Sequence, residues 1–514
     1  MAQIHIAEIN AYDPALPGVT TLRFATQGYV TAAGDTPAHT YYDGRIQQPA
    51  NVQRSCFERA TTFGRSKIGY GELILVNNDG ALDQLIDYGY DGRAITIKLG
   101  TVLPDSGGAP SWVTVLKGTM EQAEFSWQKV TIRVRDRQAE LNKPLQASLH
   151  AGSNALPNGL EGVAGDLKGK PKPWGWGTIY NAPAPCVNTS RLIYQANDGA
   201  INTVAAVYDR GAALLKGADY VSQADMETTA PAAGYFQVWP AGGYFRLGSS
   251  PAGQITADII IGALASDRTA AQAMKAAMLK AGLVAGDISA ADVTALDAAN
   301  GAEVGIWLDG GETAVTALDM LANSVGAWYG VDRLGSFRMG RIAAPGGTPA
   351  ATLTPLEIIS VDRMASRDDG RGVPAWRAAL RYKRAWITQP SDLAGAVTDA
   401  RRAELREEYR TVKSDDATVQ TAHPLAPALE FDTLLIDAAA AQTEADRRRD
   451  LYKVRRDLLE VRVRLDAALA AAIDIGNVVS VAVPRFGMTA GKLFLVIGVR
   501  TDLRDGRLDL TLWG

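Results

Sequence analysis

Hydrophobic and polar residues alternate along the last stretch of the chain. Three apolar runs, separated by turn-forming Gly, Pro and Asp residues, cover 478–483, 492–500 and 507–513. In the last run Leu508, Leu510 and Leu512 alternate with polar residues, and the stretch 459–466 alternates in the same way. Alternation with a period of two is typical of a strand that has one buried and one wet face. The pattern therefore predicts four antiparallel strands that form a small barrel or sandwich, closed by the C-terminal stretch.

The first 150 residues show the same period. Alternating residues predict strands at 95–99 and 130–134, and two further strands, 112–117 and 124–127, around Gly118. A strand at 71–76 is followed by one short helix, with Asn78 or Asp79 as its N-cap, Leu82, Leu85 and Ile86 as its apolar face and Gly89 after its C-terminal end.

The start of that helix also suggests a calcium loop. Asn77, Asp79 and Asp83 have near-ligand spacing, but an EF-type loop needs a glutamate at its twelfth position, where this chain has Tyr88. Since these residues stand where caps and turns are expected, capping is the favoured interpretation.

Glycine and proline are dense from about 150 to 180, which predicts a long connection with little regular structure. Its segment 165–173 holds three lysines, but Gly169 and Lys170 are followed by Pro171, so the order of a phosphate-binding P-loop is absent. We expect a turn that docks Trp174 and Trp176 onto a neighbour.

A second strand-rich part follows, with predicted strands at 191–195, 203–208, 235–239, 244–247 and 254–261. The aromatic residues near its second turn are open to two interpretations, a carbohydrate-stacking platform or, as we favour, a core edge or subunit interface. They are Tyr235, Phe236, Trp239, Tyr244 and Phe245.

Helical periodicity first dominates at 269–281, with Ser266 or Asp267 as the expected N-cap. A helix at 313–324 is followed by strands at 327–332 and 336–342, and Gly326 permits the change of direction between them. This order predicts a small α+β domain.

Strands return from Ile358, with a basic strand at 374–387, and a long helix is predicted at 434–455. The helix carries Arg447, Arg448, Arg449, Lys453 and Arg455, which invites a phosphate-binding interpretation. Acidic residues are interleaved at near-helical spacing, so pairing between neighbouring turns favours a solvated or subunit-contacting helix. They are Glu444, Asp446, Asp450 and Asp457.

Length and charge narrow the class of protein. The 514 residues exceed a single core, and 52 basic against 56 acidic residues give a net charge of −4, so no global basic field grips nucleic acid. The sequence shows no signal peptide at its start and no apolar run long enough to span a bilayer, so stable membrane insertion is not expected.

No motif indicates catalysis. The four histidines, His5, His39, His150 and His423, belong to no zinc-hydrolase or nucleophile-elbow pattern, and neither Cys56 nor Cys186 has a flanking base. We therefore predict no catalytic, cofactor-binding or metal-binding residue. Two cysteines are too few for a structural zinc or iron–sulfur site, and we do not expect them to form a disulfide.

Two stretches resemble known proteins. The C-terminal pattern with Asp474, Gly476, Asn477, Gly491, Lys492, Phe494, Gly498 and 510–514 resembles the final domain of bacteriophage tail-tip and baseplate hub proteins. A second stretch, with 166–173, Gly177, Asn181 and 207–211, is similar to tail proteins of non-contractile phages. Some similar hub proteins carry a cysteine-ligated iron–sulfur cluster, but this chain has too few cysteines for one.

The resemblance implies a mainly β structural virion protein with α+β parts and no enzyme activity. We expect four parts: a β domain (1–150), the connection and a second β domain (151–265), a small α+β domain (266–345) and a barrel-like domain with the long helix (346–514). The alternatives are a distal ring protein that joins the tube to the hub, and a tail-associated envelope hydrolase.

As a hub, the protein would be assembled in the host cytoplasm and lie at the tail tip of the virion. It would form a ring of identical copies, three being favoured over six, and would contact the distal tail ring, the tape measure and the central fibre. DNA would only pass through the lumen, so lumen-facing positions are expected to be acidic or neutral.

Overall fold

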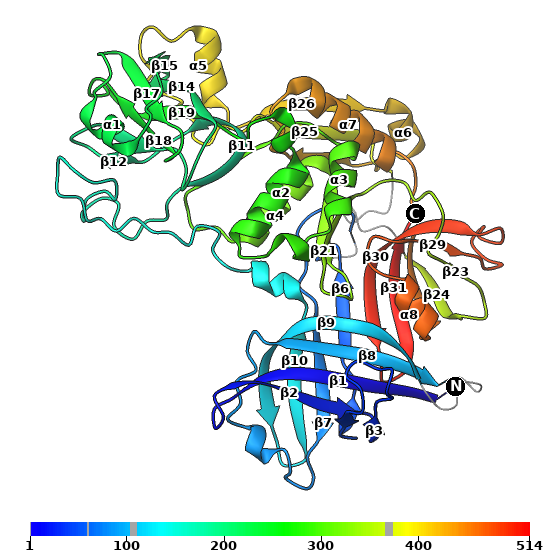
Figure 1. Cartoon of the computed structure of the whole chain (residues 1–514). Coiled ribbons are helices and arrows are strands. Elements are labelled where there is room, and N and C mark those ends of the chain that lie inside the picture. The colour runs from blue at the N-terminus through cyan, green and yellow to red at the C-terminus, as the bar shows by residue number, and fades with distance from the viewer. Residues whose placement is uncertain (1, 59–60, 103–109, 365–373) are drawn as a thin grey trace.

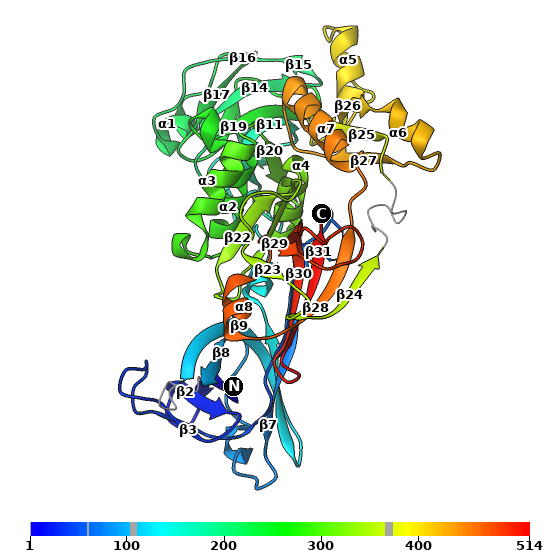
Figure 2. The same ribbon diagram turned by 90° about the vertical axis from the view of Figure 1, so that its right-hand side faces the viewer.

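The computed structural model describes residues 2–58, 61–102, 110–364 and 374–514. The chain is mainly β with several helices, as predicted. One curled sheet forms the lower end of the molecule, a second stands above it, and most of the helices and smaller sheets lie higher in both views (Figure 1; Figure 2).

The lower sheet is built from the N-terminal part of the chain, and its pairs are antiparallel. Its strands, in spatial order, are β2 (Gly18–Ala25), β1 (Ala2–Asp13), β8 (Ala94–Val102), β9 (Pro110–Phe125), β10 (Lys129–Arg135), β7 (Tyr70–Val76) and β5 (Ile46–Gln48). The short strands β3 (Tyr29–Val30) and β4 (Tyr41–Tyr42) pair with each other beside it. The predicted strands at 71–76, 95–99 and 130–134 are confirmed.

The two predicted strands around Gly118 are in fact one. β9 runs through Gly118 without a turn, and the stretch 126–128 forms the turn to β10, so Trp127 lies outside any strand. Gly118 is required for close approach, because a Cβ there would lie 2.5 Å from the carbonyl oxygen of Arg135. The glycine therefore allows the backbones of the paired strands β9 and β10 to approach closely, whereas the sequence suggested a turn at this position.

The C-terminal sheet contains the four strands predicted from the alternating pattern. They are β28 (Leu458–Arg464), β29 (Val478–Val481), β30 (Lys492–Asp502) and β31 (Arg507–Trp513), in the spatial order β29-β30-β31-β28 with antiparallel pairing. Two strands extend its edges: β23 (Ala351–Leu353) pairs parallel with β29, and β24 (Ile358–Met364) pairs antiparallel with β28.

A strand from the N-terminal part belongs to this same sheet. β6 (Asn51–Ser55) follows β5 after two residues but pairs antiparallel with β30. The buried residues of both large sheets form one hydrophobic cluster, which includes Ile9 and Leu73 as well as Val461 and Phe494. The two ends of the sequence thus share a core, and the predicted four-part division of the chain remains a prediction.

Two five-stranded sheets form the part at the upper left of Figure 1, and all five strands predicted there are confirmed within a few residues. The predicted connection ends earlier than expected, since Trp174–Ala182 is a strand. One sheet holds β15 (Ala212–Ala213), β14 (Thr203–Asp209), β19 (Ile255–Ile261), β11 (Trp174–Ala182) and β20 (Gly305–Leu308). The other holds β12 (Cys186–Asn188), β13 (Ile193–Gln195), β18 (Tyr244–Leu247), β17 (Tyr235–Trp239) and β16 (Leu215–Lys216), beside the short helix α1 (Gln223–Thr228).

The predicted helix–hairpin unit is confirmed. Helix α4 (Ala314–Val325) ends at Gly326, which has φ +63°, and the hairpin β21 (Ala327–Val331) and β22 (Phe337–Arg341) follows. Helix α2 (Ala270–Lys280) is capped by Thr269, two or three residues after the expected caps Ser266 and Asp267: its hydroxyl accepts the Gln272 N–H at 3.3 Å. A further helix, α3 (Ala290–Ala299), was not predicted, since its apolar positions do not form a clear stripe.

The long basic helix is α7 (Ala438–Tyr452), shorter than predicted at both ends. It packs on a sheet in the order β26 (Arg410–Asp415), β25 (Arg377–Tyr382) and β27 (Ala428–Asp432), so the predicted strand 374–387 is also shorter. The remaining helices are α5 (Asp399–Arg406), α6 (Ala417–Ala422) and α8 (Ala467–Ala472). Among the described residues, no helix has the length and apolar character needed to cross a bilayer.

Candidate functional site

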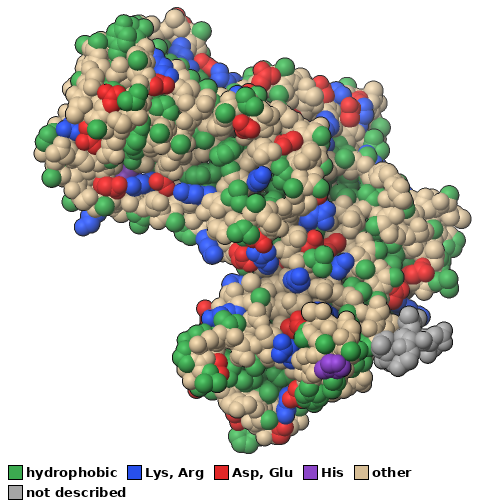
Figure 3. Space-filling view, viewed as in Figure 1, with side chains coloured by type: hydrophobic (Ala, Val, Ile, Leu, Met, Phe, Trp, Pro, Cys, Tyr) green, Lys and Arg blue, Asp and Glu red, His purple; other side chains and the backbone are tan. Residues whose placement is uncertain are grey.

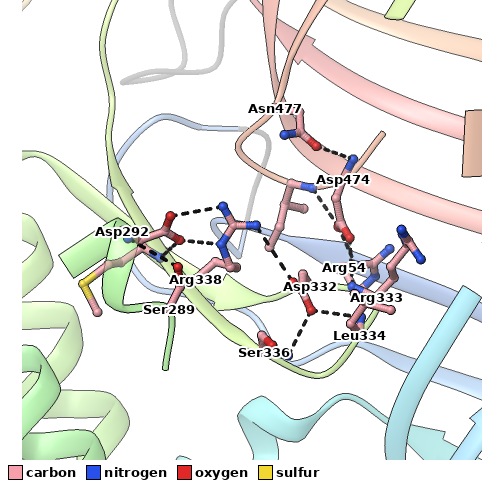
Figure 4. A network of polar contacts seen from close by, with 12 residues as sticks. Arg54, Ser289, Asp292, Asp332, Arg333, Leu334, Ser336, Arg338, Asp474 and Asn477 are labelled. Atoms are coloured by element: carbon pink, nitrogen blue, oxygen red, sulfur yellow. Dashed lines mark hydrogen bonds and ion pairs between the residues drawn. The ribbon is translucent and has the colours of Figure 1, made fainter. Parts of the chain in front are cut away.

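A buried carboxylate joins three distant segments at the centre of the molecule (Figure 4). Asp474, between α8 and β29, lies with Oδ1 2.5 Å from Nη1 of Arg54 on β6. Its Oδ2 accepts the backbone N–H of Arg333, in the β21–β22 turn, at 2.8 Å. The side chains of Arg54 and Asp474 are 4% and 11% exposed. Because a buried ion pair requires its partners close by, this contact fixes how the three segments meet.

The β21–β22 turn is itself wedged between the two large sheets. The Arg333 guanidinium donates to the carbonyl oxygens of Thr114 on β9 and Ala471 on α8, at 2.7 and 3.1 Å. In return, the Lys117 N–H donates to the Arg333 carbonyl at 2.9 Å. One residue therefore contacts the N-terminal sheet and the C-terminal part through its backbone and its side chain.

Side-chain hydrogen bonds keep this turn rigid. Asp332 Oδ1 accepts the N–H groups of Leu334 and Ser336, both at 2.9 Å (Figure 4). Gly335 has φ +80°, a conformation that glycine adopts without strain. Arg338, at the start of β22, forms an ion pair with Asp292 of α3. Contacts within the β21–β22 turn, and between β22 and α3, therefore fix the conformation that the turn presents to the sheets.

Burial raises the pKa of two titratable groups beside the junction. Asp136, 2% exposed, accepts the N–H groups of Gly69 and Gln138, at 2.7 and 3.0 Å. Burial outweighs these bonds and the charge of Arg54, and raises the pKa of Asp136 to about 7. Burial, together with the charge of Asp474, also raises the pKa of the Cys56 thiol. Cys56 is therefore a protonated, inert core residue.

Polar grooves lie where the N-terminal sheet and the C-terminal sheet meet beside β6. One, of about 480 Å³, is lined by residues of β6, β7, β9, β10 and β30, among them Glu72, Glu121, Arg133 and Arg500. Another, of about 330 Å³, continues it and shares Gln53 and Arg500. Counting both linings, the acidic residues Glu72, Glu121, Asp362, Glu460 and Asp509 face the basic residues Arg133, Arg462 and Arg500. A third groove, of about 440 Å³, shares Gln48 with the first and adds Lys129 and Arg504, so this open face is polar with its charges in balance.

The residues of the calcium alternative form loop hydrogen bonds and an ion pair, but the predicted N-cap at Asn78 or Asp79 is wrong, because Leu82 holds that position without a side-chain cap. Asn77 accepts the Leu82 N–H at 2.8 Å and donates to Asp83 Oδ1 at 2.7 Å. Asp79 forms a two-pronged pair with Arg45, with both distances 2.8 Å. The predicted helix is only a single 3₁₀ turn, Asp83–Leu85, and Ile86 faces the solvent.

Two lysines of the connection and both tryptophans contact other residues of the same chain. Lys172 pairs with Glu161 at 2.6 Å, and Lys170 lies 3.9 Å from Asp166. Trp174 is buried in the core beneath α2 and α4, and Trp176 Nε1 donates to the carbonyl of Asp267 at 2.9 Å. The neighbour that these rings contact is therefore another segment of the same chain.

The aromatic cluster of the second β part is divided between core and surface. Phe236 and Phe245 are buried, as the packing interpretation predicts. Trp239 stacks on Tyr244, with ring centroids 5.9 Å apart, and Tyr235 is 38% exposed. The packing interpretation thus holds for most of the cluster.

Helix α7 is neutralised as predicted, but one of its faces is buried instead of solvated. Asp446 and Asp450 pair with Arg449, and Asp450 also pairs with Lys453. Glu444 and Arg448, by contrast, lie in the core with side chains 0% and 2% exposed. Asp457 pairs with Arg363 and Lys492, both outside the helix.

The residues weighed for catalysis are scattered. His5 and His150 are buried, and burial lowers the pKa of His5 to about 4 and also lowers the pKa of His150. Cys56 lies in the core of the large sheets, whereas Cys186 packs against the core of the second β part, and both are free thiols. Among the described residues, no group of three potential metal-binding side chains comes together.

Sequence reasoning missed the central junction. Arg54 and Asp474 are 420 positions apart, and no local pattern links them. The one available signal was Asp474 itself, an acidic residue beside buried strands in the stretch that resembles hub proteins.

No protein-family model and no curated protein matches the chain. Three solved structures align over all of it. The tail protein from Neisseria meningitidis MC58 is 11% identical, with 97% of that chain covered and a TM-score of 0.44. For the 43 kDa tail protein of prophage MuSo2 from Shewanella oneidensis these values are 12%, 98% and 0.40, and for the prophage tail protein gp18 from Listeria monocytogenes EGD-e they are 7%, 94% and 0.41. At these scores and identities the alignments do not establish a common fold.

Proposed function

We propose that this chain is a structural protein of a phage particle, the hub of a tail tip or baseplate. It caps the tail tube, connects it to the central fibre and gates DNA passage. One observation carries the proposal: the C-terminal stretch that resembles hub proteins forms the middle strands of a sheet that also holds β6 from the N-terminal part, and this sheet shares a hydrophobic core with the N-terminal sheet. We call these two packed sheets, built from both ends of the chain, the wall.

A ring of three copies suits this wall. Each chain contributes two seven-stranded sheets, so three chains would bring six similar sheets around one axis. The junction of Arg54, Asp474 and Arg333 would hold the two sheets of each chain at a fixed angle under load. The distal tail ring, the tape measure and the central fibre are the proposed neighbours.

The open polar face suits a lumen through which DNA passes. Its grooves hold no excess of basic side chains over acidic ones, so no net positive field would hold the phosphates. A calculated surface of the assembled ring is expected to show a neutral or acidic channel, and a continuous basic channel would contradict this arrangement.

The decisive experiment is an electron cryomicroscopy reconstruction of the particle that contains this chain. The expected result is a ring of three copies at the distal end of the tail tube. A sixfold layer above the hub would instead identify the chain as the distal ring, and its absence from the particle would refute a virion role. A zymogram against the host envelope is expected to show no clearing, whereas a cleared band would indicate a hydrolase.

A further inference from the structure

Exposed apolar side chains gather on the turns at one end of the N-terminal sheet. Trp127 in the β9–β10 turn is 92% exposed, Leu16 in the β1–β2 turn is 78% exposed, and Ile86 after the 3₁₀ turn is 60% exposed. Asp87 and Asp91 lie exposed in the same loop as Ile86. We call these five residues the distal rim. Large apolar side chains exposed together on turns are typical of an interaction site.

Hydrogen bonds tie the three turns of the distal rim together. The Asn77 N–H donates to the carbonyl of Gln128 at 2.8 Å, which joins the Trp127 turn to the loop after β7. The Leu82 N–H donates to Asn77 Oδ1 at 2.8 Å, and the Tyr88 hydroxyl donates to Asp13 Oδ2 at 2.9 Å. The rim is therefore organised before any partner arrives, which lowers the entropic cost of binding.

The two aspartates of the rim outnumber the one exposed basic residue beside Trp127, Lys129. Asp87 and Asp91 form no ion pair with any residue that the structure describes. The nearest basic side chain along this loop, Arg93, lies over the Tyr12 ring at 5.3 Å. Uncompensated carboxylates beside exposed apolar groups favour a partner surface that is basic and apolar, and disfavour phosphate-rich surfaces.

A surface of that kind exists on the chain itself, in the connection before β11. Lys143 and Lys168 are exposed and have no ion-pair partner among the described residues, and Leu149 and Leu156 are 53% and 46% exposed. We call these four residues the basic ledge. Figure 3 shows Lys and Arg side chains along the lower edge of the upper part, above a hollow that separates it from the N-terminal sheet.

The basic ledge is held in place as firmly as the rim. Two stretches of the connection run antiparallel, with the His150 N–H donating to the carbonyl of Lys170, and the Lys172 N–H to that of Ser148, both at 2.9 Å. The Gly169 N–H returns a bond to the carbonyl of His150 at 2.9 Å. A loop without regular structure thus presents its leucines and lysines in a fixed arrangement.

We propose that the distal rim of one copy docks on the basic ledge of the next. Two unpaired carboxylates would meet two unpaired ammonium groups, and Trp127, Leu16 and Ile86 would cover Leu149 and Leu156. Because the two surfaces differ, the contact is heterologous and propagates from copy to copy until a ring closes. This inference rests on the proposed self-assembly of the hub and names the surfaces that carry it.

Charge reversal tests the contact on the full-length protein. The measurement is the concentration at which half of the chain is assembled, read by mass photometry and sedimentation. Asp87→Lys with Asp91→Lys is expected to raise that concentration at least about tenfold, and so is Lys143→Glu with Lys168→Glu. A variant that carries all four changes is expected to assemble again, because its basic rim meets an acidic ledge at every contact of a threefold ring. Trp127→Ser is expected to weaken assembly about tenfold.

The matched control is Glu407→Lys with Glu430→Lys, two exposed acidic residues outside both surfaces, and it is expected to leave assembly unchanged. If the wild type assembles but no rim or ledge variant changes the half-assembly concentration, the proposed contact is wrong and self-assembly stands. If the wild type stays monomeric at every concentration, both the contact and the ring are wrong. If both double variants fold and fail to assemble, and the variant with all four changes folds but also fails, the pairing of rim with ledge is wrong.

Discussion

Glu444 and Glu404 each lie among three cationic side chains, but water reaches only one of them. Glu444 on α7 pairs with Arg341, Arg447 and Arg448, and its side chain is 0% exposed. Glu404 on α5 pairs with three cations at 2.9–3.0 Å, and its side chain is 29% exposed; the three are Lys383, Arg401 and Arg410. The same charge pattern therefore occurs once in the core and once at the surface.

Both carboxylates are strongly acidic for the same reason. Burial alone would raise the pKa of Glu444, but the charge and hydrogen bonds of its arginines outweigh burial and lower the pKa to about 2. Burial likewise opposes ionisation of Glu404, and the bonds from Lys383 and Arg401 lower its pKa to about 2 as well. A shifted pKa alone does not distinguish a core cluster from a surface cluster.

The partners of the cations do distinguish them. Arg448 donates to the carbonyl of Asn323 at 2.5 Å and covers the Phe431 ring at 4.3 Å, while Arg447 donates to the carbonyl of Ile342 at 2.9 Å. These bonds join α7 to α4 and to the chain after β22, and Arg448 at the centre of the cluster is only 2% exposed. The cations around Glu404 instead surround the ring of Tyr180 at 4.6–5.1 Å, and one of them, Lys383, is 33% exposed. We therefore expect the first cluster to determine stability and the second to determine local docking.

The largest effect is expected from Glu444→Gln. The substitution keeps the shape of the side chain but leaves three buried or half-buried arginines without a counter-charge, which should lower the free energy of unfolding by about 3–5 kcal/mol. Urea titration followed by circular dichroism measures it. Asp450→Asn on the same helix is the control, because its carboxylate is 52% exposed and should contribute under about 1 kcal/mol. If Glu444→Gln and Asp450→Asn lowered the free energy of unfolding equally, burial of the carboxylate would not determine its contribution to stability.

A buried carboxylate without a bonded cation should show the opposite pH dependence. Asp136 has a folded pKa of about 7 against 3.8 when unfolded, so the folded state binds the extra proton. Its contribution to stability is full below about pH 4 and is lost as the pH rises to about 7, by up to about 4 kcal/mol. Glu444, with a lowered pKa, contributes above about pH 4.5 and loses that contribution as the pH falls to about 2.

Asp136→Asn isolates this contribution. We expect the variant to gain stability relative to wild type as the pH is raised from 4 to 8, measured as denaturant midpoints at each pH. Parallel profiles for the two proteins would mean that Asp136 does not change its charge in this range.

Asp474→Asn is an intermediate case, with one cation instead of three. Arg54 would remain buried beside a neutral amide, so the free energy of unfolding should fall by about 3 kcal/mol. Hydrogen exchange should accelerate in β6 and in the β21–β22 turn, because Asp474 also accepts the Arg333 N–H. The control is Asp509→Asn, whose pair with Arg462 is half-exposed and should contribute under about 1 kcal/mol. If Asp474→Asn lowered the free energy of unfolding no more than Asp509→Asn, the pair of Arg54 and Asp474 would not stabilise the fold.

These contrasts show what the sequence could and could not predict. Alternation located β28, β30 and β31 almost to the residue, because the period of two reports which face of a strand is buried. It does not report the neighbouring strand, so the pairing of β6 with β30 was invisible. Local spacing also predicted that acidic residues on α7 would neutralise its basic ones, as the pairs of Arg449 and Lys453 with Asp446 and Asp450 show, but not the further pair of Lys453 with Asp416 outside the helix.

The spacing of residues along the helix could not show how deeply each side chain is buried. Glu444 and Asp450 look alike in the sequence, yet one carboxylate is 0% and the other 52% exposed. Burial depends on which elements pack against α7, and that is set by residues more than 100 positions away, as the contacts of Arg341 and Asn323 show. Gly118 was misjudged for a related reason, because its role is to admit the backbone of another strand.

The smallest effect is expected from Glu404→Gln. Water can enter beside α5 and solvate the freed cations, so the global free energy of unfolding should change by about 1 kcal/mol or less. The change should be local: amides of α5 should exchange faster, and 1 M NaCl should reproduce the effect in the wild type, because exposed pairs are screened by salt. Glu407→Gln, at an exposed position of the same segment, is the control. If Glu404→Gln destabilised the whole chain as much as Glu444→Gln, exposure would not separate the two clusters, and the number of cations around a carboxylate would determine its contribution instead.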